Sequence, residues 1–97
     1  MDIHDNEGMK LLVKAFMAID DEQECVDFLE DVMTYKEMQD ISQRILVAKM
    51  LSEQAVYNKI VEETGASTAT ISRVNRSYNY GSGGYAKILD KINKENK

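Results

Sequence analysis

The sequence contains no proline and no tryptophan, and it has one cysteine and one histidine among its 97 residues. Because proline interrupts helices, its absence favours continuous helical segments. A single cysteine cannot form an internal disulfide, which is typical of proteins in the reducing cytoplasm. One histidine and one cysteine are also too few for a Ser/His/Asp or Cys/His catalytic set or for a zinc site. We therefore expect neither an enzyme nor a metal-binding protein.

Long apolar runs are also missing. The longest mostly apolar stretch, residues 11–19, is interrupted by Lys14 and is too short to cross a bilayer. No basic segment followed by an apolar core stands at the N-terminus, so no signal peptide is expected. With 43% hydrophobic and 30% charged residues, the chain has the composition of a globular protein. We expect one domain spanning residues 1–97, located in the cytoplasm.

The net charge of −5 is distributed unevenly along the chain. Residues 1–65 carry 6 basic and 15 acidic groups, a net charge of −9. Residues 66–97 carry 6 basic and 2 acidic groups, a net charge of +4. A polyanion would therefore meet the last third of the chain, and the acidic remainder would disfavour other orientations.

Hydrophobic periodicity, capping residues and glycines predict six helices and an all-α fold. Asp20 is expected to cap the second helix, Thr34 the third and Ser67 the fifth, while residues 79–84 form a glycine-rich connector. The expected helices cover approximately residues 9–19, 21–32, 35–51, 55–64, 68–77 and 84–95.

Two of these helices carry more apolar side chains than a single small chain can readily bury. Residues 9–19 are apolar nearly all round, and residues 35–51 show a stripe that is wider than one core face. Leaving several such side chains in water would cost several kcal/mol, at about 25 cal/mol per Å². We therefore expect a homodimer. The alternative is a monomer in which the final helix folds back over the exposed surface.

Residues 57–76 match the physical requirements of a helix-turn-helix. Gly65 stands at the turn position that needs a left-handed backbone, and Ala66 is small enough to lie beneath the turn. Val61 occupies a position of close helix approach that usually holds a smaller residue, which predicts a slightly wider crossing. The remaining inner positions are all apolar: Ile60, Ile71 and Val74. The predicted motif spans about residues 55–77.

The outer face of the predicted second helix combines small residues, hydroxyls and arginines, which suit the major groove of double-stranded DNA. The residues that open the preceding helix are placed to hold phosphates. The alternative is that this face is simply solvated. The candidate DNA-binding residues are Tyr57, Asn58, Lys59, Thr68, Ala69, Thr70, Ser72, Arg73 and Arg76.

Residues 33–51 (MTYKEMQDISQRILVAKML) and residues 64–73 (TGASTATISR) resemble the Trp-repressor superfamily, in particular its Trp-repressor-related YerC/YecD family. The first stretch is similar to the family's capped helix with a single arginine. The second, more specific stretch is similar to its turn and recognition helix. The resemblance covers about residues 31–80 well and the rest of the chain more loosely. It implies a six-helix fold and an intertwined homodimer.

The resemblance also implies roles for individual residues. Two arginines enclose the indole of the corepressor in the Trp repressor, and Arg44 and Arg73 match them here. Thr34 and Ser77 match polar positions near the bound amino acid. Because Val74 replaces a glycine beside the ligand, tryptophan is not expected as the effector. On the operator side, the residues matching DNA-facing positions are Thr68, Ala69, Thr70 and Ser72, and those approaching the backbone are Tyr57 and Asn58.

Several alternatives stay open at this point. Arg73 can contact phosphate, clamp a ligand or serve as plain surface charge, and Arg44 can pair with Asp40 or Glu37 on its own helix. The basic final helix is expected to cover the dimer rather than lie on a membrane. The sequence predicts a DNA-binding transcriptional regulator, a repressor, that needs no cofactor. The alternative is a helix-turn-helix that serves as a protein-interaction module without reading DNA.

Overall fold

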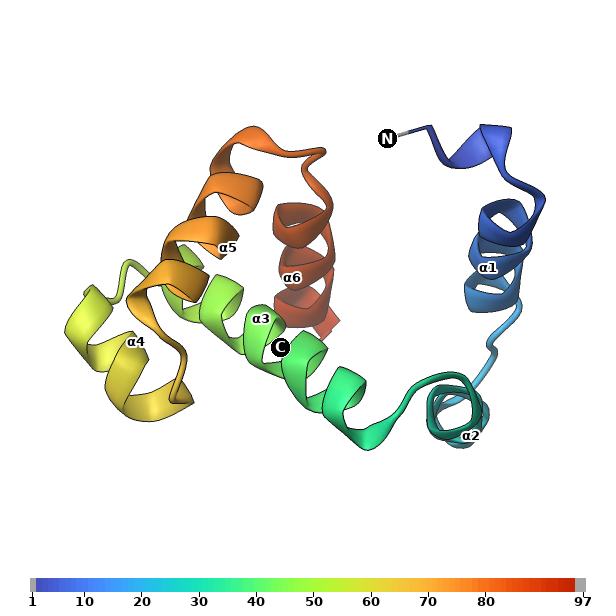
Figure 1. Ribbon diagram of the computed structural model, residues 1–97, viewed down its shortest axis with the longest axis horizontal. Helices are drawn as coiled ribbons and strands as arrows, with labels where there is room; N and C mark the ends of the chain where they lie inside the picture. Colours follow the sequence, from blue (N-terminus) through green and yellow to red (C-terminus); the bar gives the residue numbers. More distant parts are fainter. Residues whose placement is uncertain (1, 96–97) are drawn as a thin grey trace. The chain divides into compact units, whose positions relative to one another are not determined.

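The computed structural model describes residues 2–95, which form six α-helices, one 3-10 turn (Ile3–Asp5) and no β-strand. This confirms the all-α fold (Figure 1). The chain divides into two compact units, one ending at Tyr35 and the other beginning at Lys36. The helices are α1 (Glu7–Met17), α2 (Glu22–Val32), α3 (Tyr35–Ser52), α4 (Tyr57–Thr64), α5 (Thr68–Tyr80) and α6 (Gly84–Glu95).

The first unit is a pair of capped helices. Asn6 caps α1, and its Oδ1 accepts a hydrogen bond from the Met9 amide at 2.9 Å. The rings of Phe16 on α1 and Phe28 on α2 meet edge to face, with centroids 5.6 Å apart. No residue between 2 and 35 is buried. This unit therefore has no core of its own in the single chain.

The predicted cap of α2 is wrong by one residue. Asp21, not Asp20, is the N-cap, and its Oδ1 accepts from the Glu24 amide at 2.8 Å. The Asp20 amide instead donates to Glu24 Oε1 at 3.1 Å. Either aspartate could accept a hydrogen bond from the amides at the helix start. The carboxylate of Glu24 favours Asp21 as the cap, because it then accepts from the amide of Asp20, the residue before the cap.

Four boundaries in three helices also differ from the prediction by two or more residues. Helix α1 begins and ends two residues earlier than expected, and α4 begins at Tyr57 instead of residue 55. Helix α5 continues to Tyr80, so Asn79 and Tyr80 are helical and not part of the connector. The Asn79 side chain explains this extension, because its Nδ2 donates to the Asn75 carbonyl at 3.0 Å and ties the last turn together.

The second unit holds the core. Its buried residues come from four helices and the turn between α4 and α5. Leu51, Ala55, Tyr78 and Tyr85 pack against them. Leu89 is the buried residue of α6 and joins this helix to the core. The core residues are Val47, Ala48, Met50, Ile60, Ala66, Ile71, Val74 and Leu89.

A large apolar surface stays exposed in the single chain. Leu11 and Met17 of α1 are 67% and 81% exposed, and Ile45 on the predicted stripe of α3 is 45% exposed. Ile88 and Ile92 of α6 are also exposed, so the final helix buries only part of its apolar face. Within residues 2–95, no helix combines the length and the hydrophobicity required to cross a bilayer.

Candidate nucleic-acid interface

The turn between α4 and α5 has the geometry that the sequence predicts. Gly65 closes α4 in the left-handed region, at φ 71° and ψ 3°, and its amide donates to the Val61 carbonyl at 2.9 Å. Ala66 follows and is 2% exposed. A left-handed residue reverses the chain within one step, so α5 can begin three residues later, at Thr68. The two helices are thereby held as one helix-turn-helix (Figure 1).

Side chains lock this turn to the rest of the unit. Thr64 Oγ1 donates to the Ile60 carbonyl at 2.7 Å and accepts from the Ala66 amide at 3.1 Å. Gln43 Nε2 of α3 donates to the Thr64 carbonyl at 3.1 Å. Sequence reasoning missed Gln43, and no local signal could have found it, because its partner lies 21 residues along the chain.

The start of α5 is fixed by the predicted cap. Ser67 Oγ accepts from the Thr70 amide at 3.1 Å, which satisfies one of the free amides of the first turn. The same Oγ donates to Thr70 Oγ1 at 3.1 Å. The hydroxyl of Thr70 is therefore already engaged within the helix start, and its side chain is half-buried.

Helix α5 has two distinct faces. Ile71 and Val74 are 0% and 3% exposed and form its inner side. The outer side carries no acidic residue. The exposed candidates on this helix are Thr68, Ala69, Ser72, Arg73 and Arg76. The structure thus brings together hydroxyl, methyl and guanidinium groups on one accessible surface. The hydroxyl and guanidinium groups can hydrogen-bond to base edges and phosphates, and the methyl groups can make apolar contacts with bases.

The beginning of α4 offers a second polar surface. Val56 precedes the helix and supplies no side-chain cap. The amides of Lys59 and Ile60 donate to the Val56 carbonyl, at 3.1 and 3.2 Å. Free amides at a helix start attract anions such as phosphate. The three candidates here are exposed: Tyr57, Asn58 and Lys59.

Two candidate effector residues line one cavity. Arg44 of α3 and Arg73 of α5 face a space of about 200 Å³, together with Asp40, Thr70 and Val74. Asp40 pairs with Lys36 at 3.1 Å, and Arg44 forms no ion pair with any part of the chain that the structure describes. In this structure Asp40 therefore pairs with Lys36 and not with Arg44.

Ser77, another effector candidate, does not line this cavity. Ser77 lines a separate cavity of about 410 Å³ with the glycine-rich connector, including Gly81 and Gly84. Thr34 belongs to the first unit. Among residues 2–95, no cluster of three or more His, Cys, Asp or Glu side chains is placed to hold a metal ion. The lone Cys25 is free and half-buried.

These features define a helix-turn-helix with an accessible polar face on its second helix. The chain belongs to the Trp repressor protein family, which matches residues 7–93. Members of this family are regulators and not enzymes, and the family indicates a DNA-binding role. The predicted family resemblance is therefore confirmed.

Individual relatives support the same assignment. An uncharacterized protein of Bacillus subtilis, YerC, is 47% identical over 81 residues, which cover 84% of this chain and 78% of YerC. A crystal structure of a TrpR-like protein from Eubacterium eligens is 48% identical with a TM-score of 0.86, and the match covers 91% of both chains. A Trp repressor candidate from Staphylococcus aureus is 41% identical with a TM-score of 0.88, covering 96% of this chain and 95% of its own.

Proposed function

We propose that this protein is a cytoplasmic, sequence-specific transcriptional repressor that binds double-stranded DNA as a homodimer. One observation carries the proposal. The Gly65 turn holds α5 so that its apolar side is buried while its polar side is free, and this side lies in the basic part of the chain. By occupying its DNA site, the protein blocks access of other proteins to that DNA, without catalysis.

Helix α5 is the recognition helix in this proposal. Its first turns present Thr68, Ala69 and Ser72, which are small enough to approach base edges in the major groove. Arg76, one turn further on, reaches phosphate. Tyr57, Asn58 and Lys59 at the start of α4 hold the neighbouring backbone. Thr70 acts mainly on the position of Ser67, because their hydroxyls are hydrogen-bonded to each other.

The exposed apolar surface supports the homodimer. Leu11, Met17, Ile88 and Leu46 are 67%, 81%, 55% and 44% exposed in the single chain. Surfaces of this kind on a small protein are usually covered by a partner. A dimer presents two copies of α5, and these would enter successive major grooves about 34 Å apart on a roughly palindromic site.

The cavity at Arg44 and Arg73 supports regulation by a small effector. Two guanidinium groups on its wall favour an anionic or planar group. Its volume of about 200 Å³ is below the roughly 300–1,000 Å³ usual for ligand pockets, and Val74 forms part of its wall. We therefore propose that the effector is smaller than tryptophan. Arg73 is shared between this cavity and the DNA-facing surface, so an effector here would change DNA affinity.

A gel-shift or fluorescence titration against selected DNA fragments, repeated from low to physiological salt, tests the proposal. If about six phosphates are neutralised, the slope of log affinity against log salt lies near −5. Ser72→Ala changes the preferred sequence, whereas Arg76→Ala weakens all sequences alike and makes the slope shallower by about 1. An affinity that does not depend on salt contradicts DNA binding.

The acidic first part of the chain favours one competing function, a helix-turn-helix that binds protein. Residues 1–65 carry a net charge of −9, which repels DNA. In that case every DNA sequence binds equally weakly, and Ser72→Ala changes no preference. Adding single amino acids and small organic acids to the DNA titration tests effector control separately. DNA affinity that changes with one of these compounds indicates an effector, and the Arg44→Ala variant is expected to lose that response.

A further inference from the structure

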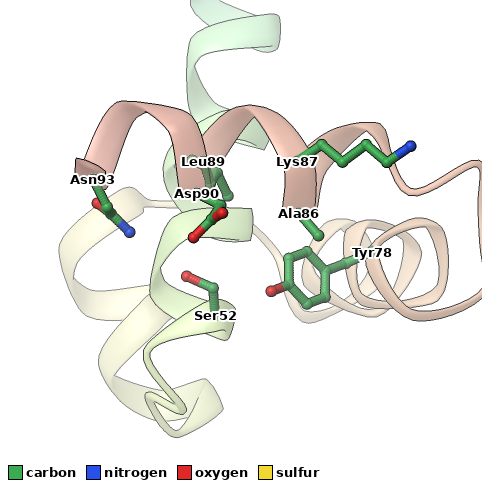
Figure 2. A pocket seen from close by; sticks show the side chains of 7 residues that line it. All are labelled: Ser52, Tyr78, Ala86, Lys87, Leu89, Asp90 and Asn93. Atoms are coloured by element: carbon green, nitrogen blue, oxygen red, sulfur yellow. The ribbon is translucent and has the colours of Figure 1, made fainter. Parts of the chain in front are cut away.

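A larger cavity lies at the far end of α5, away from the candidate effector residues. It has a volume of about 470 Å³ and is bounded by the last residue of α3, the end of α5 and one face of α6 (Figure 2). This volume is within the range usual for small-molecule sites. None of the candidate DNA-binding or effector residues lines it.

Hydrogen-bond acceptors converge in this cavity. Figure 2 shows the hydroxyls of Ser52 and Tyr78 and the carboxylate of Asp90 directed toward a common space. The hydroxyl of Ser52 donates to the Lys49 carbonyl at 2.5 Å, so its oxygen is left to accept. Ser52 also ends α3, and the carbonyl end of a helix favours a positive charge. The site therefore suits a cation that carries several N–H donors.

The two nearby lysines, Lys87 and Lys94, do not occupy the space between Ser52, Tyr78 and Asp90. Lys87 lines the cavity, but Figure 2 shows its side chain extending away from Ser52 and Tyr78. Lys94 pairs with Asp90 at 3.0 Å, and the two side chains are 73% and 63% exposed. A pair as exposed as this is worth about 1 kcal/mol or less, so a bound ammonium group can replace Lys94.

One wall of the cavity is apolar. Ala86 and Leu89 of α6 line it, and Leu89 is 7% exposed because its other side packs into the core. A short aliphatic chain on this wall would be removed from water. From this combination we propose that the cavity binds a small primary amine, with its ammonium group at Asp90, Ser52 and Tyr78 and its carbon chain on Ala86 and Leu89.

The cavity and the exposed isoleucines lie on different sides of α6. At about 100° per residue, Ile88 lies on the side of α6 opposite Ala86, and Ile92 lies opposite Asp90. A second copy that packs only on the two exposed isoleucines would therefore leave the cavity open. The cavity is lined by Tyr78 of α5 and Ser52 of α3. A bound ligand would therefore contact the recognition helix. The binding itself does not depend on the proposed DNA function.

Three ligands of equal chain length test the proposal on the full protein: hexylamine, hexanol and hexanoate. Calorimetric titration is expected to give an affinity for hexylamine about fivefold above that for the other two, as for an ion pair with an exposed carboxylate. Amide chemical-shift changes are expected at Ala86 and Leu89. Equal affinity for the three ligands, no detectable binding of hexylamine, or shifts confined to other residues would overturn the proposal.

Two variants of the site are expected to act in opposite directions. Asp90→Asn removes the preference for hexylamine over hexanol, and Lys94→Met strengthens hexylamine binding by up to about fivefold because it frees the carboxylate. Glu62→Gln on α4 makes the same change of charge away from the cavity and leaves binding unchanged. If Glu62→Gln weakens binding as much as Asp90→Asn, attraction to an acidic protein explains the data and the proposal is wrong.

Discussion

The two units of this protein treat their apolar residues in opposite ways. Residues 2–35 contain no buried residue, although α1 carries Leu11, Leu12, Val13, Phe16 and Met17. The unit that begins at Lys36 buries residues from all four of its helices. The units also differ in charge, since residues 1–35 carry 2 basic and 10 acidic groups and residues 36–97 carry 10 and 7.

This difference separates two tasks. The second unit has a core that fixes the angle between α4 and α5, which a DNA-reading surface requires. The first unit has apolar side chains without a core, which is the property of an association surface. Its excess of negative charge would repel a polyanion, so DNA is expected to meet the second unit. The comparison therefore predicts that association and stability depend on different residues.

The largest effect is expected from charge on the exposed face of α1. Val13→Lys combined with Met17→Lys places two ammonium groups where a second copy would pack. We expect sedimentation equilibrium to show the mass falling from twice 11.0 kDa to 11.0 kDa. DNA affinity falls by about 100-fold or more because the two half-sites are no longer linked.

The matched control for this variant is Glu30→Lys. It makes the same change of net charge on α2, at an exposed position whose aliphatic stem is not part of the apolar face. The control remains a dimer. A wild-type chain that sediments as a monomer at all concentrations would contradict the division of tasks between the units.

The next effect compares truncation in the two units. Ile71 is fully buried, so Ile71→Ala lowers the free energy of unfolding by about 2–5 kcal/mol. Leu11 is 67% exposed in the single chain, so Leu11→Ala has an effect only through the dimer. Urea unfolding at two protein concentrations measures both. If Leu11→Ala costs as much at low concentration as Ile71→Ala, the first unit has a core that the single chain does not show.

The turn between α4 and α5 in the second unit is the best-predicted feature, and its local chemistry explains why. The turn needs one left-handed residue, one small residue and one cap, and Gly65, Ala66 and Ser67 supply them in consecutive positions. Such requirements can be recognised in a sequence without knowing the rest of the fold. The start of α2 was harder, because Asp20 and Asp21 satisfy the same rule.

Long-range features could not be predicted from spacing. Arg44 and Arg73 line one cavity although 29 positions separate them in the sequence, and only the family resemblance indicated this. The bond from Gln43 to Thr64 and the cavity at Ser52, Tyr78 and Asp90 depend on how helices pack. The extension of α5 was missed because asparagine is typical of turns, whereas Asn79 here bonds within the helix.

A smaller effect is expected at the turn itself. A Cβ added at Gly65 would meet no atom within 4 Å, so the cost of Gly65→Ala is conformational and not steric. We expect a loss of about 1–2 kcal/mol, since alanine disfavours a positive φ. Gly84→Ala is the control, because Gly84 opens α6 and a Cβ there is also unobstructed. Thermal unfolding distinguishes the two, and an equal response would mean that the turn can relax without glycine.

The smallest effect on stability is expected from removing one helix N-cap in each unit, which compares the two units directly. Asp21→Ala and Ser67→Ala each delete a side-chain acceptor at a helix start and are each expected to cost about 1 kcal/mol in unfolding experiments. Their effects on DNA binding differ. Ser67→Ala frays the first turn of α5 and lowers DNA affinity several-fold, whereas Asp21→Ala leaves the affinity per dimer unchanged. Equal losses of DNA affinity would mean that the two units do not act separately.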